Sequence, residues 1–483
     1  MQLLTIQRIL GILLALFSLT MLPPIFVSWL FEDGEAQAFI SALFLLLAFG
    51  LALWLPARKH RKELKIRDGF IVVVMFWLAL GLSGSLPFFL STNPLMSFTD
   101  AVFESMSGLT TTGSTVLTGL DELPQSILFY RQFLQWLGGM GIVVLAVAIL
   151  PLLGVGGMQL YRAETPGPMK DAKLTPRITE TAKALWYIYM SLTIACAIAY
   201  HWAGMTWFDA ICHSFSTVAI GGFSTHDASI GHFNSGLIEM IAVLFMLISA
   251  LNFSLHFLAW RGRSVKHYWQ DSELRVFFGI MLVVSLVTFA YLMLTATVEG
   301  IGLTARQAIF QTVSIGTTAG FATADFAYWP GFLPILLLFC SYIGGCAFST
   351  AGGMKVIRVM LLFKQGYREV LRLIHPNGVF AIRVNGKALP AKVVGAVWGF
   401  FALYVFCFTI MHLALMSTGL DVVTAFSAVT ACLNNLGPGL GDVSANFGTI
   451  NDTSKWILCV AMLLGRLEIF TLLVLLTPAF WRR

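Results

Sequence analysis

Four short segments of the chain share one pattern, and each is flanked by long apolar runs. Each copy holds an alanine and, twelve residues later, a glycine: Ala101 with Gly113, Ala210 with Gly222, Ala308 with Gly320, and Ala425 with Gly437. The copies align without gaps. Four in-register copies of one short element predict a single central site at which all four meet.

Each copy begins with a predicted short helix. Four residues before each alanine lies a residue type that caps helix N-termini, namely Ser97, Thr206, Thr304 and Asp421. In the first three copies Asp100, Asp209 and Gln307 follow the cap by three residues, which predicts a capping box or a near variant. The resulting helices of about three turns are too short to cross a bilayer, which needs about 20 residues.

An irregular, glycine-bearing segment follows each short helix: TTTGST, AIGGFS, TTAGFA and LNNLGPG. In hydrocarbon, irregular backbone occurs where it is buried in protein or lines a water-filled cavity. Glycine permits positive φ, so consecutive carbonyls can turn toward one axis, where a ring of carbonyls replaces the hydration shell of a cation. The negative C-terminal ends of the helices also favour a cation. The alternative for any single copy is a re-entrant or interfacial loop with a structural glycine.

Composition places the chain among all-α polytopic membrane proteins. Of its 483 residues 58% are hydrophobic and 11% are charged, against about 25% charged in soluble proteins. The length suffices for ten spans and short loops. No hydrophilic run is long enough for a separate soluble domain, so any soluble regulatory domain would have to belong to another chain. The net charge of +6 comes from basic residues in short loops between spans, which argues against nucleic-acid binding. The seven cysteines lack C-x-x-C spacing and are expected to be inert buried thiols.

Charge in the connections predicts the topology. An N-terminal transmembrane hairpin, residues 1–68, ends in the basic run RKHRKELKIR, which marks the cytoplasmic side and places the N-terminus there too. Four units of span, short helix, loop and span follow, at 69–155, 180–262, 274–366 and 388–482. The opposite side is weakly acidic, so the glycine segments are expected to open outward. This acidity has two possible explanations. It forms a vestibule that raises the local cation concentration, or it only reflects the ordinary charge difference between the two sides of a membrane protein.

At this point the sequence resembles the Trk/Ktr/HKT superfamily of potassium transporters, most closely the TrkH/TrkG membrane subunits of the bacterial Trk potassium-uptake system. The resemblance covers essentially the whole chain, including GGMGIVVLAVAILPLLGVGGMQLYRAETPGP after the first loop and LGRLEIFTLL near the end. It implies a multi-pass protein of the bacterial inner membrane, a pseudo-fourfold pore like that of a K+ channel, and a homodimer. It also implies a cytoplasmic TrkA-type partner that binds NAD or ATP.

The same resemblance implies a K+ selectivity filter. Its residues are Thr110, Thr111, Thr112 and Gly113; Ala219, Ile220, Gly221 and Gly222; Thr317, Thr318, Ala319 and Gly320; and Asn434, Asn435, Leu436 and Gly437. Backbone carbonyls of Thr111, Thr112, Ile220, Gly221, Thr318, Ala319, Asn435 and Leu436 are expected to hold K+. Related plant proteins with serine at the first glycine favour sodium, so Gly113 favours potassium. The fourth segment, NNLGPG, departs most from the pattern, which puts a strict fourfold cage in doubt.

The second span of the third unit is too long for one crossing and is interrupted at Gly344-Gly345 and at Gly352-Gly353. Ser349 and Thr350 lie between the breaks. The resemblance implies a gating loop at this position, and the alternative is close helix packing through glycine. Lys355, just past the loop, is expected to be a charge at the cytoplasmic end.

Arg466 is the other expected gate residue. It lies eleven residues after Lys455, about 16 Å along a helix and near the midplane of a core of about 30 Å. A charge there costs at least about 2.5–3.5 kcal/mol, so it should face the protein interior. The resemblance implies an electrostatic barrier below the filter. The alternative is a structural ion pair or an anchor that bonds to backbone carbonyls, and Glu468 faces the wrong way to be the direct partner of an ion pair. In the outer mouth, His226-Asp227 is a weak metal-binding signal.

These features predict a K+-selective, gated pathway that moves K+ inward, driven by the membrane potential. No Walker A motif is present, so we expect no ATP hydrolysis, no organic cofactor and no enzymatic activity. One alternative is a proton- or sodium-coupled symporter, for which Arg466, Glu468 and Glu104 are the deeply placed relay candidates. Another is a membrane scaffold for a cytoplasmic sensor, which leaves the four registered segments unexplained.

Overall fold

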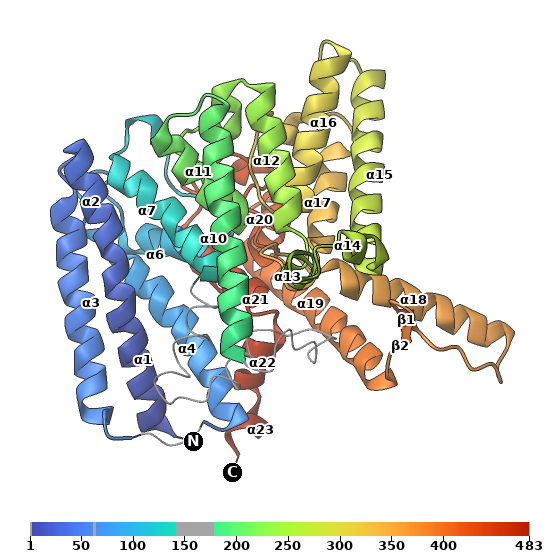
Figure 1. Ribbon diagram of the computed structural model, residues 1–483, viewed down its shortest axis with the longest axis horizontal. Helices are drawn as coiled ribbons and strands as arrows, with labels where there is room; N and C mark the ends of the chain where they lie inside the picture. The colour runs from blue at the N-terminus through green and yellow to red at the C-terminus, as the bar shows by residue number, and fades with distance from the viewer. Residues whose placement is uncertain (1, 61–63, 142–177, 483) are drawn as a thin grey trace.

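The computed structural model describes residues 2–60, 64–141 and 178–482, and most of these residues are helical (Figure 1). Within these ranges the strands form one hairpin, β1 (Arg383–Val384) with β2 (Lys387–Ala388), paired antiparallel with Arg383 opposite Ala388. The predicted all-α class is therefore confirmed. Residues 142–155 of the first expected unit, and most of the quoted stretch beginning GGMG, lie outside the described residues.

The N-terminal hairpin lies at one edge of the molecule (Figure 1). It consists of α1 (Leu3–Ser18), η1 (Leu19–Met21), α2 (Leu22–Phe31) and α3 (Ala36–Ala57). Gly11 of α1 faces Gly50 of α3, and a Cβ on Gly11 would lie only 2.7 Å from the Gly50 carbonyl oxygen. Small residues at this contact let the two backbones approach closely, as is common between membrane helices.

Four stretches then follow, and each contains a long helix, a short helix and a glycine-bearing loop. Stretch 1 holds α4 (Ile66–Gly84), α5 (Leu86–Leu90), α6 (Phe98–Leu109), η2 (Leu120–Glu122), α7 (Gln125–Trp136) and a π-helical turn η3 (Leu137–Gly141). Stretch 2 holds α10 (Ile178–Trp202), α11 (Trp207–Ala219), η4 (Ser229–Phe233), α12 (Gly236–Ser249) and α13 (Phe253–Gly262).

Stretches 3 and 4 repeat this order. Stretch 3 holds α14 (Lys266–Gln270), α15 (Ser272–Leu294), α16 (Ile301–Gly316), η5 (Phe326–Tyr328), α17 (Leu333–Ile343) and α18 (Val356–Ile374). Stretch 4 holds α19 (Ala391–Ser417), α20 (Val422–Leu433), η6 (Gly441–Val443), α21 (Asp452–Arg466), α22 (Phe470–Leu476) and α23 (Pro478–Trp481). The β-hairpin connects α18 to α19.

Among the described residues, six helical segments are long and apolar enough to cross a membrane, and two bent helix pairs bring the number to as many as eight. The bends are 90° between α12 and α13 and 116° between α21 and α22. In stretches 2 to 4 the second helix is therefore broken or short, whereas the second helix of stretch 1 runs up to residues outside the described ranges. A broken span places irregular backbone inside the protein, where other segments must satisfy its polar groups.

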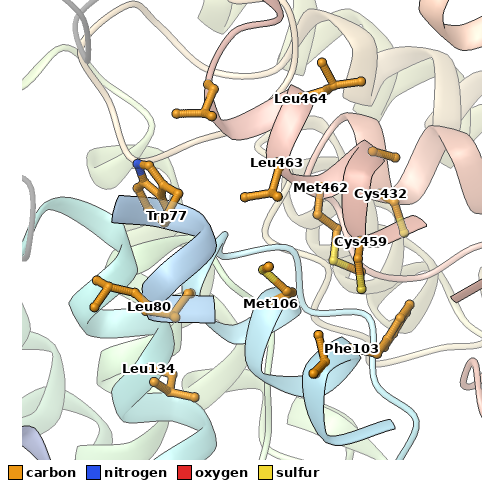
Figure 2. Close-up of a cluster of buried hydrophobic side chains, with 14 of the residues drawn as sticks. Trp77, Leu80, Phe103, Met106, Leu134, Cys432, Cys459, Met462, Leu463 and Leu464 are labelled. Atoms are coloured by element: carbon orange, nitrogen blue, oxygen red, sulfur yellow. The ribbon is translucent and has the colours of Figure 1, made fainter. Parts of the chain in front are cut away.

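Stretches 1 and 4 share the largest hydrophobic core. Figure 2 shows Trp77 and Leu80 of α4 and Met106 of α6 close to side chains of α20 and α21. The labelled partners from stretch 4 are Cys432, Cys459, Met462, Leu463 and Leu464, all buried. Because the last stretch packs against the first, the chain closes on itself rather than forming an open row.

Three of the four predicted N-caps are present. Ser97 and Thr206 accept hydrogen bonds from the backbone N–H groups of Asp100 and Asp209, and Asp421 caps α20 in the same way. The prediction for Thr304 is wrong, because α16 already begins at Ile301. The Thr304 hydroxyl lies inside that helix and donates to the Gly300 carbonyl oxygen over 2.9 Å.

Candidate ion-binding site

The four short helices α6, α11, α16 and α20 end in one common hydrogen-bond pattern. We call the segments after them glycine loops 1 to 4: residues 110–115, 219–224, 317–322 and 433–439. In each, the residue before the aligned glycine donates its N–H to the helix carbonyl five residues back: Thr112 to Ser107 (2.9 Å), Gly221 to Ser216 (2.8 Å), Ala319 to Ser314 (2.7 Å) and Leu436 to Ala431 (2.7 Å). Such bonds are typical of helices that end in a left-handed residue.

The backbone conformation of the loops is equally regular. The residues two positions before the aligned glycines, Thr111, Ile220, Thr318 and Asn435, have φ between 52° and 68°. The glycines themselves have φ between 78° and 106°. Non-glycine residues with positive φ are strained, and four equivalent ones indicate a functional constraint. In each loop two residues of positive φ are separated by one residue of negative φ. The carbonyl groups therefore do not point to opposite sides in turn, as they do along a β-strand.

The four loops meet in a closed ring. A Cβ on Gly113 would collide with the carbonyl oxygen of Gly221, one on Gly222 with that of Ala319, and one on Gly320 with that of Leu436. The ring closes where a Cβ on Gly437 would lie 3.0 Å from the carbonyl oxygen of Thr112. Each loop thus presents a carbonyl oxygen to the glycine of the preceding loop, and loop 1 presents one to the glycine of loop 4. The four loops are therefore in direct backbone contact around a closed ring.

Glycine loops 1 and 2 are supported by α7. Arg131 forms a buried ion pair with Glu104 (2.7 Å) and donates to the carbonyl oxygen of Ser224 (3.1 Å). Gln135 donates to the carbonyl oxygen of Gly221 (2.6 Å) and accepts from the N–H of Phe223 (3.1 Å). Sequence reasoning missed Arg131 and Gln135. Their signal was three polar side chains, Arg131, Gln132 and Gln135, within about one helical turn, since such groups are costly in a membrane and must have partners.

Glycine loop 4 differs in its side chains. Asn435 donates to the hydroxyl of Thr112 (2.9 Å) in loop 1 and to the carbonyl oxygen of Met462 (3.0 Å). Asn434 donates to Ser341 (2.9 Å). The aligned glycines of loops 1 to 3 are partly exposed, whereas Gly437 is buried. Loop 4 therefore has the same backbone conformation as the other loops, but the amide side chains of Asn434 and Asn435 bond to neighbouring segments.

The predicted interruption between α17 and α18 is confirmed. Residues 344–355, which we call the interior loop, separate the two helices. Gly352 donates its N–H to the hydroxyl of Thr318 (2.6 Å), and Gly353 donates to the carbonyl oxygen of Asn434 (3.0 Å). Thr350 donates to the carbonyl oxygen of Val218 (3.0 Å). The interior loop therefore lies against the ends of α11, α16 and α20, directly beside glycine loops 2, 3 and 4.

Arg466, the last residue of α21, completes this contact on the side of loop 1. Its guanidinium donates to the hydroxyl of Thr111 (3.1 Å), to the carbonyl oxygen of Thr350 (3.4 Å) and to that of Gly139 (2.7 Å). It also donates to the carbonyl oxygen of Gly138. The structure thus brings Arg466 together with the interior loop and glycine loop 1.

Two charged neighbours of the interior loop behave differently. Glu468 pairs with Arg358 of α18, in agreement with the expectation that it does not pair with Arg466. Lys355 is not an exposed charge at a helix end. It is buried, and its ammonium donates to the carbonyl oxygen of Ala351 within the interior loop. Lys355 does lie at a helix end, as the residue before α18, but its side chain points back into the interior loop and is not exposed to solvent.

Comparison with known proteins identifies a family and several similar proteins. The TrkH family model, described as a cation transport protein, matches residues 35–483. The Trk system potassium uptake protein TrkH of Vibrio parahaemolyticus serotype O3:K6 is 62% identical over 484 residues, the whole of both chains. TrkH of Escherichia coli K12 is 57% identical over 99% of each chain. TrkG of the same strain is 42% identical over 98% of this chain and 97% of TrkG.

Among solved structures, the crystal structure of the potassium transporter TrkH from Vibrio parahaemolyticus superposes with a TM-score of 0.91 at 60% identity and full coverage of both chains. The resemblance seen in the sequence is therefore confirmed, and the identities favour TrkH over TrkG. A family of cation transport proteins also agrees with the expectation that the chain is not an enzyme. With its family match from residue 35 to residue 483 and close relatives along its whole length, this chain belongs to the TrkH family of cation transport proteins.

Proposed function

We propose that this protein takes up potassium across the bacterial inner membrane as the membrane subunit of a Trk system. The relatives named above are potassium uptake proteins of the Trk system. Within this function, the glycine loops act as a K+ filter, and the interior loop with Arg466 acts as the gate. K+ moves inward, driven by the membrane potential.

The closed ring of carbonyl oxygens supports the filter most directly. The oxygens of Thr112, Gly221, Ala319 and Leu436 come from four equivalent positions, and each lies against the glycine of a neighbouring loop. Neutral carbonyl dipoles can replace the water around a monovalent cation without binding it too tightly to leave. The ends of four short helices add negative partial charge at the same place. The remaining expected ligands, the carbonyls of Thr111, Ile220, Thr318 and Asn435, are one position earlier in each loop.

The contacts of the interior loop support the gate. Gly344, Gly345, Gly352 and Gly353 flank its two ends, and Ser349 and Thr350 lie between them. Its residues bond to three glycine loops or their helices, and Arg466 bonds to the fourth. A segment in this position obstructs the path of an ion that leaves the filter. The guanidinium adds a positive charge, which repels K+ in a low-dielectric interior.

The relay candidates of a coupled symporter are each engaged separately. Glu104 pairs with Arg131, Glu468 pairs with Arg358, and Arg466 bonds to carbonyl oxygens of Gly138 and Gly139. A proton relay requires titratable groups that hand a proton from one to the next. These separate pairings favour a gated pathway over a symporter.

The assembly we propose is a homodimer with its N-terminus in the cytoplasm and a TrkA-type NAD- or ATP-binding subunit as partner. The Trk system name of the relatives supports a multi-subunit system. The described residues of the basic run RKHRKELKIR, 58–60 and 64–67, lie at the same end of the molecule as the start of α1 and as α23 (Figure 1), which supports a cytoplasmic location for that end.

Uptake of radiolabelled Rb+ into proteoliposomes tests the function. With pH and Na+ equal on both sides, we expect an inside-negative potential alone to drive uptake, and K+ to compete. A requirement for a proton or sodium gradient would instead establish the symporter. Absence of uptake under all gradients, with the partner subunit still bound, would establish the scaffold.

A further inference from the structure

Three possible metal ligands from two stretches come together outside glycine loop 2. Asp121 belongs to η2, His232 belongs to η4, and His226 lies four residues after Gly222. One ligand atom from each side chain lies within 4.8 Å of the other two. The sequence offered only His226-Asp227 as a weak signal, because Asp121 is far away along the chain.

The three side chains pack directly against one another. The rings of His226 and His232 are stacked with centroids 3.5 Å apart and 2° between their planes. Nδ1 of His226 contacts Oδ1 of Asp121, and Nδ1 of His232 lies 3.9 Å from the same oxygen. Asp121 and His232 are 46% and 44% exposed, so an ion can reach the cluster from solvent.

Neighbouring groups hold the remaining atoms of these side chains. Oδ1 of Asp209 lies 3.5 Å from Nε2 of His226, on the opposite side of the ring from Asp121. Asp209 is itself fixed by hydrogen bonds from Thr206 (2.7 Å) and Thr225 (2.8 Å). A carboxylate behind the ring is the usual support of a histidine that binds a metal through its other nitrogen. The second oxygen of Asp121 accepts the N–H of Asp227 (3.4 Å).

The chemistry of the cluster favours a transition metal over K+, Mg2+ or Ca2+. Imidazole nitrogens suit Zn2+ and related ions, whereas Mg2+ and Ca2+ prefer oxygen ligands. Ligands of one tetrahedral Zn2+ lie about 3.3 Å apart, so small rotations of exposed side chains bring these three into range. The carboxylates of Asp121 and Asp209 place negative charge on both sides of the His226 ring. The same negative field attracts a divalent cation.

We propose that Asp121, His226 and His232 form a binding site for a divalent transition-metal ion such as Zn2+, with water as the fourth ligand. The site is formed by two sequence-distant outer loops, so the bound ion cross-links stretch 1 to stretch 2. No residue of the proposed filter or gate takes part in it.

The site is connected to glycine loop 2 through short contacts. The backbone N–H of His226 donates to the hydroxyl of Ser224 (3.1 Å). The backbone carbonyl oxygen of Ser224 accepts from the Arg131 guanidinium (3.1 Å). His213 contacts the same hydroxyl (2.9 Å). A bound dication adds positive charge beside the outer end of the loop and restricts its movement. We therefore expect external Zn2+ to lower K+ uptake, a step that rests on the proposed transport function.

Equilibrium binding of Zn2+ to the purified full chain, without an affinity tag, tests the site independently of transport. We expect one ion per chain in the wild type, and at least about tenfold weaker binding in His226→Gln, in His232→Gln and in Asp121→Asn. His375→Gln, at an exposed histidine beyond α18, is the matched control and should bind like the wild type. Equal binding by the wild type and all three site variants would overturn the proposal, and His232→Gln changes only an exposed side chain, so misfolding does not obscure the result.

Rb+ uptake with and without external Zn2+ tests the effect on transport. We expect Zn2+, but not Mg2+ at the same concentration, to inhibit the wild type, and the inhibition to shift by at least about tenfold in His232→Gln. Inhibition that is the same in wild type and variant, or absent from a wild type that binds Zn2+, would overturn the effect on uptake. Uptake measured without Zn2+ reports the proposed function separately.

Discussion

The glycine loops and the interior loop are both irregular segments inside the protein, but they are held in different ways. Each glycine loop bonds to the short helix from which it emerges, as Thr112 does to Ser107. The interior loop depends on distant partners: Cys346 donates to the carbonyl oxygen of Ala250 (2.9 Å), and Ala347 donates to the carboxylate of Glu273 (2.7 Å). A segment held by its own helix keeps its conformation, whereas one held by other elements can move when those contacts are exchanged. This difference is what a fixed filter and a movable gate require.

Substitution of Gly113 should have the largest effect, because it breaks a fixed loop. In Gly113→Ala the new methyl group meets the carbonyl oxygen of Gly221, and φ of 83° is unfavourable for any L-residue. We expect K+ uptake to fall severalfold and the preference for K+ over Na+ to be lost, because the methyl group displaces the carbonyl oxygen of Gly221. Gly34→Ala is the matched control, because Gly34 has the same φ of 83° with open space around its Cβ position.

The control separates strain from collision. The left-handed conformation costs alanine about 1–2 kcal/mol, which both variants share. Rb+ uptake, normalised to the amount of folded protein in the membrane, should stay near wild type in Gly34→Ala. Equal losses of uptake in the two variants would show that backbone strain, and not the ring of carbonyls, causes the defect.

Release of the interior loop should raise K+ uptake, whereas substitution of Gly113 lowers it. In Gly352→Ala the methyl group collides with the carbonyl oxygen of Asn434, which separates the interior loop from glycine loop 4. We expect severalfold higher uptake in the absence of a regulatory subunit. Gly366→Ala in α18, where the Cβ position has open space, should match the wild type. Unchanged or lower uptake in correctly folded Gly352→Ala would argue that the interior loop is only a packing element.

Arg466 sharpens the same comparison, since it joins the interior loop to glycine loop 1. Arg466→Ala removes the charge and the bonds to Thr350 and Thr111, so basal uptake should rise. Arg466→Lys keeps the charge but lacks the planar fork that serves several carbonyl oxygens, so we expect a smaller rise. A loss of uptake in Arg466→Ala, with normal expression and thermal stability, would contradict an electrostatic barrier.

The smallest expected effect concerns the helices that carry the glycine loops. Thr206 caps α11 through the N–H of Asp209 (3.1 Å), so Thr206→Ala should destabilise the protein by about 1 kcal/mol. Thr304 lies inside α16, and Thr304→Ala should change stability less. The midpoints of thermal unfolding in detergent compare the two directly. A larger shift for Thr304→Ala would mean that the cap of α11 contributes little.

Local features of the sequence predicted much of this architecture. The recurring spacing from alanine to glycine located all four loops, and paired glycines marked both ends of the interior loop. These features depend on residues close together in the chain, such as glycines at positive φ. The start of α16 was missed because Gly300 precedes three further helical residues before Thr304, and a threonine inside a helix looks like a cap when only the sequence is read.

The supporting groups could not be predicted in the same way. Arg131 meets Glu104 across 27 positions, and Glu273 meets Ala347 across 74. No short pattern encodes such pairs, because tertiary packing brings them together. Lys355 was misread for the same reason, since its burial depends on how the interior loop folds back. The cluster of Asp121, His226 and His232 likewise appears only when two outer loops are brought together.

The most direct test of the filter is competition between Na+ and K+ for Rb+ uptake in wild type and Gly113→Ser proteoliposomes at an imposed inside-negative potential. We predict that K+ competes in the wild type and Na+ does not, and that Gly113→Ser admits Na+. Uptake that depends on a proton or sodium gradient, with the same ion preference in Gly113→Ser as in the wild type, would contradict a K+ filter built from the glycine loops.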